Sequence, residues 1–220
     1  LRRLDTAALL RTGMLAELEN TPGAIGFAAC VVPAVAELLR RQYPLRVSFL
    51  TPAMVQGVDF SAVDVDTVGA DRLANVAAAQ ALGISPAVIV DCGTAITTEV
   101  LDRDCRFLGG VIMPGRRLAR QALRDHTALL PMVELSSTEF PAPWGHNTVA
   151  AIRTGIDLGL VAAIGKLVGD SLERLGGGRA LATGGDAPFF ISKIPLLEPV
   201  PEHFTLSGLA YVLSRRSIQG

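Results

Sequence analysis

The sequence predicts an α/β protein, and three observations lead to this fold class. Four apolar residues at 87–90 form a buried strand that ends at Asp91, and the segment 95–101 reads as a β-rich return strand. The chain after this point continues with a third strand, a helix and two further strand and helix alternations. The part before Gly83 reads strand, helix, strand, helix. Alternating strands and helices are typical of α/β folds.

Chain length and composition set the scale of this fold. A chain of 220 residues suits one large domain or two small ones, and we expect subdomains at 1–83 and 84–220 with a cleft between them. The net charge of −1 gives no reason to expect binding to nucleic acid or to an anionic membrane. No uninterrupted apolar run reaches the roughly 18 residues of a membrane span, and no basic-then-apolar leader opens the chain.

The three cysteines indicate a reducing compartment. Cys30, Cys92 and Cys105 are odd in number and lack Cys-x-x-Cys spacing. This pattern favours a cytoplasmic protein without structural zinc. The histidines are scattered and no His-Glu-x-x-His motif occurs, so we expect no transition-metal site.

The first half contains short elements. Pro33 suits the first turn of a helix that runs to Gln42. The other expected elements are a helix at 14–19, strands at 24–29 and 46–50, and a loop at 51–67 with extended structure around 63–65.

A helix opens at Val68 and runs to about Ala81, with Asp71 in its first turn. One interpretation is that this carboxylate complements the helix dipole, which is worth about 0.3–1 kcal/mol. The other is that Asp71 faces a cleft, because helix N-termini also hold anions.

The hairpin around Asp91 is the main candidate site. Gly93 allows a tight reversal at which backbone N–H groups can approach a ligand, and Thr94 offers a hydroxyl. Such a tip is a place where phosphate oxygens and a cation can meet. A strand that simply ends in a polar turn is the alternative.

The second half continues with a strand at 107–113, broken by two glycines, and a basic helix at 116–124. A long amphipathic helix follows at 147–175. Its glycines leave one side of the helix without bulky side chains. That side either packs against another helix within the monomer or forms a dimer interface.

A short strand at 179–182 leads into Gly184-Gly185, and a helix at 205–215 closes the chain. A glycine-rich turn after a buried strand can admit a nucleotide close to the backbone, although such turns are common.

The order of elements fits the ribonuclease H-like unit from which actin and the sugar kinases are built. Those proteins carry two such units, with the nucleotide in the cleft between them. By this symmetry, the first unit here lacks its N-terminal β-hairpin.

Seven segments, in order, resemble the type III pantothenate kinases, also called the Bvg accessory factor family. They are Val68–Arg72, Asp91–Thr97, Leu108–Gly115, Thr127–Pro131, Gly145–Thr148, Thr183–Gly185 and Leu206–Leu209.

The resemblance implies a role for each matching residue. Asp71 resembles the general base that accepts the proton of the substrate's primary hydroxyl. Asp91 resembles the ligand of a monovalent cation. The implied pantothenate contacts are Gly69, Ala70, Arg72 and Thr148, and the implied ATP contacts are Gly93, Thr94, Gly184 and Gly185.

The implied activity is ATP-dependent phosphorylation of pantothenate to 4′-phosphopantothenate, the first step of coenzyme A biosynthesis. The implied cofactors are Mg²⁺ carried by ATP and K⁺ or NH₄⁺ at Asp91. The implied assembly is a homodimer through the helix at 147–175, because a second subunit completes the family's substrate pocket.

Two departures keep alternatives open. The family's N-terminal Asp-x-Gly-Asn-Thr hairpin has no counterpart in this sequence, which leaves room for a relative that binds ligand or regulates without catalysis. Ala62 stands where the family usually has a substrate-binding tyrosine, which leaves room for a kinase of the same fold with a different small alcohol.

Overall fold

The computed structural model describes residues 9–10, 12, 15–135 and 140–216. Their contacts group the chain into two compact units, which we describe separately. Unit 1 contains the described residues up to Val58, then Asp64–Leu82, and those from His203 onward. Unit 2 contains Asp59–Val63 and Gly83–Glu202. The expected subdomains at 1–83 and 84–220 stay a prediction beside this grouping by contacts.

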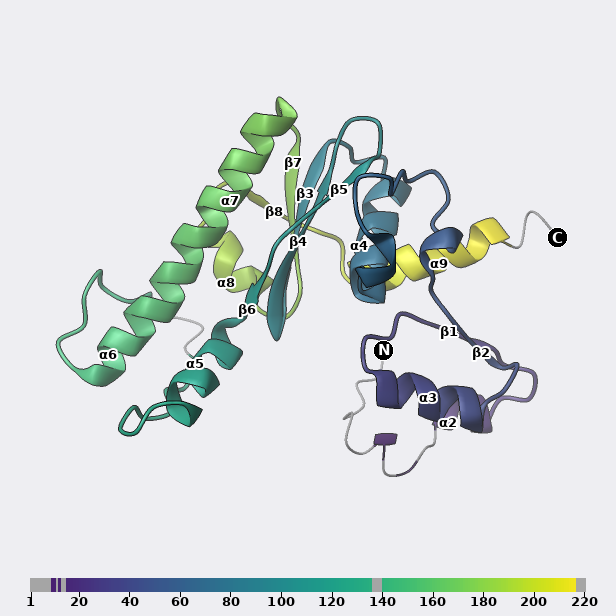
Figure 1. Ribbon diagram of the computed structural model, residues 1–220, viewed down its shortest axis with the longest axis horizontal. Helices are drawn as coiled ribbons and strands as arrows, with labels where there is room; N and C mark the ends of the chain where they lie inside the picture. The colour runs from purple at the N-terminus through teal and green to yellow at the C-terminus, as the bar shows by residue number, and fades with distance from the viewer. Residues whose placement is uncertain (1–8, 11, 13–14, 136–139, 217–220) are drawn as a thin grey trace. The chain divides into compact units, whose positions relative to one another are not determined.

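The sheet of unit 2 has six strands among the described residues (Figure 1). Its order is β5-β4-β3-β7-β8, and β6 pairs with β4. β3 runs antiparallel to β4 and parallel to β7, so it is central. The strands are β3 (Ala87–Cys92), β4 (Ala95–Leu101), β5 (Phe107–Gly109), β6 (Ile112–Pro114), β7 (Arg179–Thr183) and β8 (Leu197–Pro199).

The core of unit 2 lies between the sheet and α7 (Gly159–Leu175), the long helix at the left of Figure 1. Val88, Val90 and Ile96 of the strands pack with Ile164 and Val168 of the helix, and all five are buried. Burial of these side chains supplies the main driving force for this packing. The remaining helices of unit 2 are α5 (Arg116–Asp125), α6 (Thr148–Arg153) and α8 (Ala187–Ile191).

The expected long helix is continuous, and a π-helical turn at Thr154–Leu158 separates α6 from α7. By length and hydropathy, Thr148–Leu175 would also pass as a membrane span. It carries a buried Asp157 with two arginine partners, however, and Ile164 and Val168 pack against the sheet. Part of its apolar side is therefore a core face of unit 2.

Unit 1 combines a small parallel sheet with two sets of helices. β1 (Gly26–Ala28) pairs with β2 (Val47–Phe49), and α3 (Pro33–Gln42) connects them. α2 (Ala16–Glu19) packs beside α3 through Leu18, Val35 and Leu39. The expected helix start at Met14 lies outside the described residues.

Two longer helices, α4 (Ala70–Ala81) and α9 (Phe204–Arg216), pack together in unit 1. A Cβ atom on Gly208 of α9 would collide with the backbone of Ala74 in α4, so glycine permits this close approach. The Thr205 hydroxyl also lies 2.7 Å from Oδ1 of the buried Asn75. This packing places the last helix of the chain in the N-terminal unit, which the sequence did not predict.

Short 3₁₀ helices at Pro52–Met54 and Val65–Thr67 interrupt the expected loop. The expectation of extended structure around 63–65 is wrong at Val65. There the backbone turns, with the Val68 N–H donating to the Val65 carbonyl.

Candidate functional site

The tip of the β3–β4 hairpin, residues 91–94 (hereafter the hairpin tip), lies at one end of the sheet of unit 2. Asp91 is the next-to-last residue of β3, and its register partners are Thr97 on β4 and Thr183 on β7. The four residues before it are buried in the core, whereas Asp91 is half-buried. The strand thus delivers a carboxylate to the edge of the core, as the sequence predicted.

The turn itself is packed backbone against backbone. The Gly93 N–H donates to the Ala95 carbonyl at 3.0 Å, and the Gly115 N–H donates to the Thr94 carbonyl at 2.9 Å. A Cβ atom on Gly115 would collide with the carbonyl oxygens of Gly93 and Thr94. The start of α5 is therefore fixed directly on the hairpin tip.

The turn after β7, residues 183–186 (hereafter the glycine turn), lies against the other side of the same tip. Gly184 has a φ of +93°, and a Cβ atom there would lie 2.6 Å from both Asp91 Oδ1 and the Cys92 carbonyl oxygen. The Asp186 N–H donates to that carbonyl at 2.9 Å. Gly185 has no neighbour within 4 Å of its Cβ position, so its surface is open. Unit 2 thereby brings Asp91, Gly93, Thr94, Gly184 and Gly185 together at one end of its sheet.

Cys92 reports on the electrostatics of this end of the sheet. Burial raises the pKa of its thiol to about 12, and the nearby Asp91 and Asp186 carboxylates contribute to the rise. The thiol is therefore protonated at neutral pH and is a core group rather than a nucleophile.

A buried ion network lies behind the glycine turn. Asp157 accepts hydrogen bonds from Arg116 Nε at 2.9 Å and from Arg120 Nη2 at 2.7 Å, and all three side chains are at most 3% exposed. Arg116 Nη1 also lies 3.8 Å from Asp186 Oδ1. This network was not predicted from the sequence. Its available signal was the pair Arg116 and Arg120, four residues apart in the basic helix, together with Asp157 in the more apolar first half of the long helix.

Thr148 lies in a separate groove of unit 2. The groove has a volume of about 830 Å³ and is lined by residues of α5, the segment 145–148 and the first turns of the long helix. Asn147 caps this helix by accepting a hydrogen bond from Ala150 N–H at 2.9 Å. The cap fixes Thr148 as the first residue of α6. The expected contact thus faces a mostly apolar groove.

The other predicted residues belong to unit 1, at the start of α4. Gly69 is the N-cap residue, and Ala70, Asp71 and Arg72 form the first turn. Asp71 Oδ1 accepts a hydrogen bond from the Arg72 N–H at 2.8 Å. Asp71 and Arg72 are half-buried, whereas Leu73–Ala79 behind them are buried. This helix start places a carboxylate and a guanidinium in one helical turn, a suitable pair for an alcohol with a carboxylate tail.

The described residues contain no group of three or more His, Cys, Asp or Glu side chains that could hold a metal. A site made only of such ligands therefore has no support in this part of the chain. A hard cation accepts carboxylate, carbonyl and phosphate oxygens in combination. Asp91 and the surrounding backbone of the hairpin tip fit that donor set.

Comparisons with known proteins found similarity over most of the chain. The family profile described as type III pantothenate kinase matches residues 5–170. A type III pantothenate kinase from Exiguobacterium sibiricum is 32% identical over 212 residues, which cover 94% of this chain and 82% of that protein. One from Frankia alni is 33% identical over 218 residues, which cover 96% and 85%.

A solved structure shows the same fold. A conserved Baf family protein from Campylobacter jejuni aligns with a TM-score of 0.65 at 19% identity, covering 98% of this chain and 90% of that one. This likeness confirms the predicted mixed α/β fold.

Proposed function

We propose that this chain, which belongs to the type III pantothenate kinase family, transfers the γ-phosphoryl group of ATP to the primary hydroxyl of pantothenate. The product would be 4′-phosphopantothenate, at the first step of coenzyme A biosynthesis. The predicted family resemblance is confirmed, and membership in a kinase family implies the use of ATP.

The observation that carries this proposal is the construction of the hairpin tip. Two glycines from distant parts of the chain, Gly115 and Gly184, pack against it where no side chain would fit. That arrangement leaves the Thr94 hydroxyl and the open Gly185 to meet phosphate oxygens, while Gly93, whose N–H already donates to the Ala95 carbonyl, permits close approach to the backbone. Backbone N–H groups and hydroxyls are suitable donors for this purpose.

In the proposed reaction, Asp71 accepts the proton of the pantothenate hydroxyl, and Arg72 binds the pantothenate carboxylate through its planar guanidinium. Gly69 and Ala70 permit close approach of substrate to the backbone. Phosphoryl transfer depends mainly on positioning and charge neutralisation, so little covalent chemistry is required of the protein. A positioned base contributes about 10²–10⁴-fold to such a reaction.

Two cations complete the proposal. Mg²⁺ would arrive with ATP and neutralise phosphate charge, and K⁺ or NH₄⁺ would be held by Asp91. The half-buried Asp91 carboxylate supports the second assignment, because Asp91 Oδ1 and the Cys92 carbonyl oxygen both lie 2.6 Å from the Cβ position of Gly184.

A coupled assay of ADP release tests the activity. Pantothenate-dependent ADP release in the presence of ATP, Mg²⁺ and K⁺ is expected, with a fall when Na⁺ replaces K⁺. ADP release that does not depend on pantothenate but increases with another small alcohol would favour a different substrate. Nucleotide binding without turnover would favour a ligand-binding relative.

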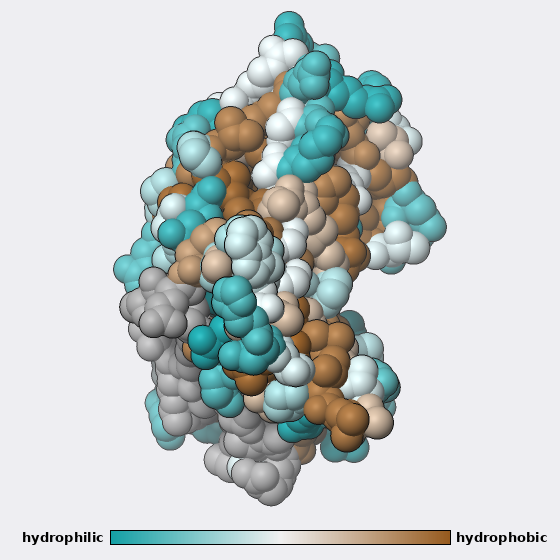
Figure 2. Space-filling model, turned by 90° about the vertical axis from the view of Figure 1, so that its left-hand side faces the viewer, coloured by the Kyte–Doolittle hydropathy of each residue, from teal (hydrophilic) through white to brown (hydrophobic). Residues whose placement is uncertain are grey.

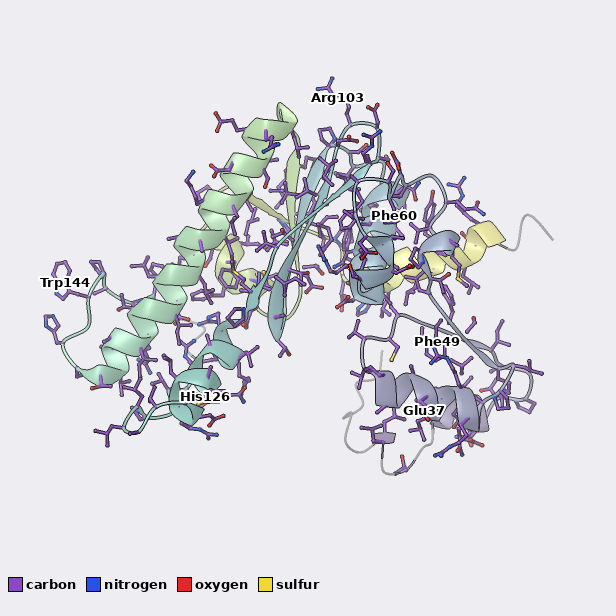
Figure 3. All side chains as sticks on the ribbon, in the orientation of Figure 1. Glu37, Phe49, Phe60, Arg103, His126 and Trp144 are labelled. Atoms are coloured by element: carbon purple, nitrogen blue, oxygen red, sulfur yellow. The ribbon has the colours of Figure 1, made fainter. Side chains whose placement is uncertain are left out.

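We also propose a homodimer formed through the helix at 147–175. Its first half exposes small residues, and the Cβ positions of Gly155 and Gly159 have no neighbour within 4 Å. Leu129 and Trp144 nearby are 92% and 67% exposed. Trp144 points away from the long helix in Figure 3, and Figure 2 shows apolar surface among polar groups on this side. These features suit burial against a second copy.

Light scattering with a matched pair of variants checks the dimer. Gly159→Arg places a charge on the small-residue half of the helix, so a shift from dimer to monomer is expected. Lys166→Ala lies on the charged half, where Lys166 pairs with Asp170 in an exposed ion pair, and the dimer should persist. A monomeric unaltered chain would contradict the proposal.

The cytoplasm is the proposed location. The family consists of soluble metabolic enzymes, and Cys30, Cys92 and Cys105 are all free thiols. Free thiols are usual in a reducing compartment.

A further inference from the structure

Arg116 is a buried cation that touches three separate parts of unit 2. It is the first residue of α5, and its side chain is 3% exposed. It donates to Asp157 on the long helix and lies 3.8 Å from the Asp186 carboxylate at the end of the glycine turn. Its guanidinium carbon lies 3.5 Å from the centroid of the Phe189 ring in α8. One side chain therefore connects α5, the long helix and the start of α8.

The Asp157 carboxylate holds this cation in one orientation. Asp157 lies within the π-helical turn, a geometry that often occurs at functional positions. One of its oxygens binds Arg116 and the other binds Arg120, so both are occupied by charged donors. Charge-assisted bonds of this kind are short and directional.

An acidic group of the glycine turn lies beside this cluster. Two buried guanidiniums face a single buried carboxylate at Asp157, and the fourth group, Asp186, is 28% exposed. Attraction between Arg116 and Asp186 therefore draws the end of the glycine turn toward α5.

The backbone beside Arg116 is attached to the hairpin tip. Gly115, the preceding residue, donates its N–H to the Thr94 carbonyl. From this geometry we infer that Arg116 is a positioning residue for the nucleotide. It fixes the glycine turn at a set spacing from the hairpin tip, so that both can contact the phosphates together. The inference rests on the proposed use of this end of the sheet as the ATP site.

Arg116 and Arg120 provide a matched pair for the test. Both are buried and both bind Asp157, but only Arg116 also contacts Asp186 and Phe189. Replacing either with lysine keeps the charge and removes the planar fork. The dissociation constant of a non-hydrolysable ATP analogue, measured by calorimetry on the full chain, is the primary readout. The melting temperature and the KM values for ATP and pantothenate accompany it.

Arg116→Lys should weaken binding of the analogue about tenfold, as expected when a group that orients a binding element is lost. The KM for ATP should rise in parallel, while the KM for pantothenate stays within about twofold. Arg120→Lys should lower the melting temperature to a similar extent and leave analogue affinity within about twofold. Phe189→Leu, which removes the stacked ring and keeps an apolar side chain, should weaken affinity in the same direction as Arg116→Lys.

Equal losses of affinity in the Arg116 and Arg120 variants would overturn the inference and assign the network a purely structural role. Unchanged affinity in both Arg116→Lys and Phe189→Leu would also overturn it, as would an unaltered chain that binds no analogue. If Arg116→Lys does not fold, Phe189→Leu decides the question. A chain that binds the analogue in an Arg116-dependent way but does not phosphorylate pantothenate would refute the proposed function and leave this inference standing.

Discussion

The two units build their candidate residues by different means. In unit 2, the hairpin tip is enclosed by backbone contacts from Gly115 and Gly184 and supported by a buried ion network. In unit 1, Asp71 lies at the start of a helix, where its carboxylate accepts a hydrogen bond from the adjacent Arg72 N–H. The first arrangement suits rigid binding of phosphates, and the second leaves a carboxylate able to change partners. A general base requires this freedom, because it must accept a proton from a ligand that arrives and leaves.

The largest effect is expected in unit 1. Asp71→Asn should reduce kcat by about 10²–10⁴-fold, because the amide cannot accept the proton of the hydroxyl. ATP affinity should change little. Asp66→Asn, an exposed residue in the preceding 3₁₀ helix, is the control and should retain full activity. Equal turnover by Asp71→Asn and the unaltered enzyme would remove Asp71 from the mechanism.

The next effect concerns the rigidity of unit 2. Gly184→Ala should lower the free energy of unfolding by about 2–5 kcal/mol, because a left-handed backbone and overpacking both oppose a side chain there. It should also abolish tight ATP binding, since the new methyl group would meet Asp91 Oδ1 and the Cys92 carbonyl oxygen. Chemical denaturation and calorimetry measure the two losses.

Gly185→Ala is the matched control for this variant. Its Cβ position has no neighbour within 4 Å, so the free energy of unfolding should change by no more than about 0.5 kcal/mol. Similar destabilisation by the two substitutions would show that the contact between the glycine turn and the hairpin tip does not govern stability.

The smallest effect is a dependence of stability on pH. A cysteine in the unfolded chain ionises near pH 9, whereas the Cys92 thiol in the folded chain has a pKa of about 12. The stability associated with the protonated thiol is therefore complete below pH 9 and is lost as the pH rises toward 12. The loss per pH unit has an upper limit of about 1.4 kcal/mol. Denaturation at pH 8 and pH 10 should show a smaller difference for Cys92→Ala than for the unaltered chain.

Much of the fold follows from the sequence because its long elements have clear periodicity and clear ends. The helix at 33–42 and the strand at 95–101 have the predicted bounds. The expected strand at 107–113 divides into β5 and β6, because Gly109 adopts a φ of +103°. The short elements α8 and β8 have five and three residues, too few to show a period.

The candidate site was predictable where its functional residues are neighbours in the sequence. Asp91, Gly93 and Thr94 are adjacent in sequence, so the turn that unites them is visible without a structure. Arg116 and Asp157 are 41 residues apart, and their pairing depends on how α5 and the long helix pack. Tertiary packing also assigns α9 to unit 1, which no local pattern could indicate.

The packing of α9 against α4 affects the order in which the chain folds during synthesis. The chain passes between the units after Val58, Val63, Leu82 and Glu202, so no single cut separates them. The buried face of α4 is covered by α9, the last helix described. Unit 1 can therefore close only after the ribosome has released residues 204–216. Until then the alanine-rich side of α4, which α9 covers in the folded chain, stays uncovered.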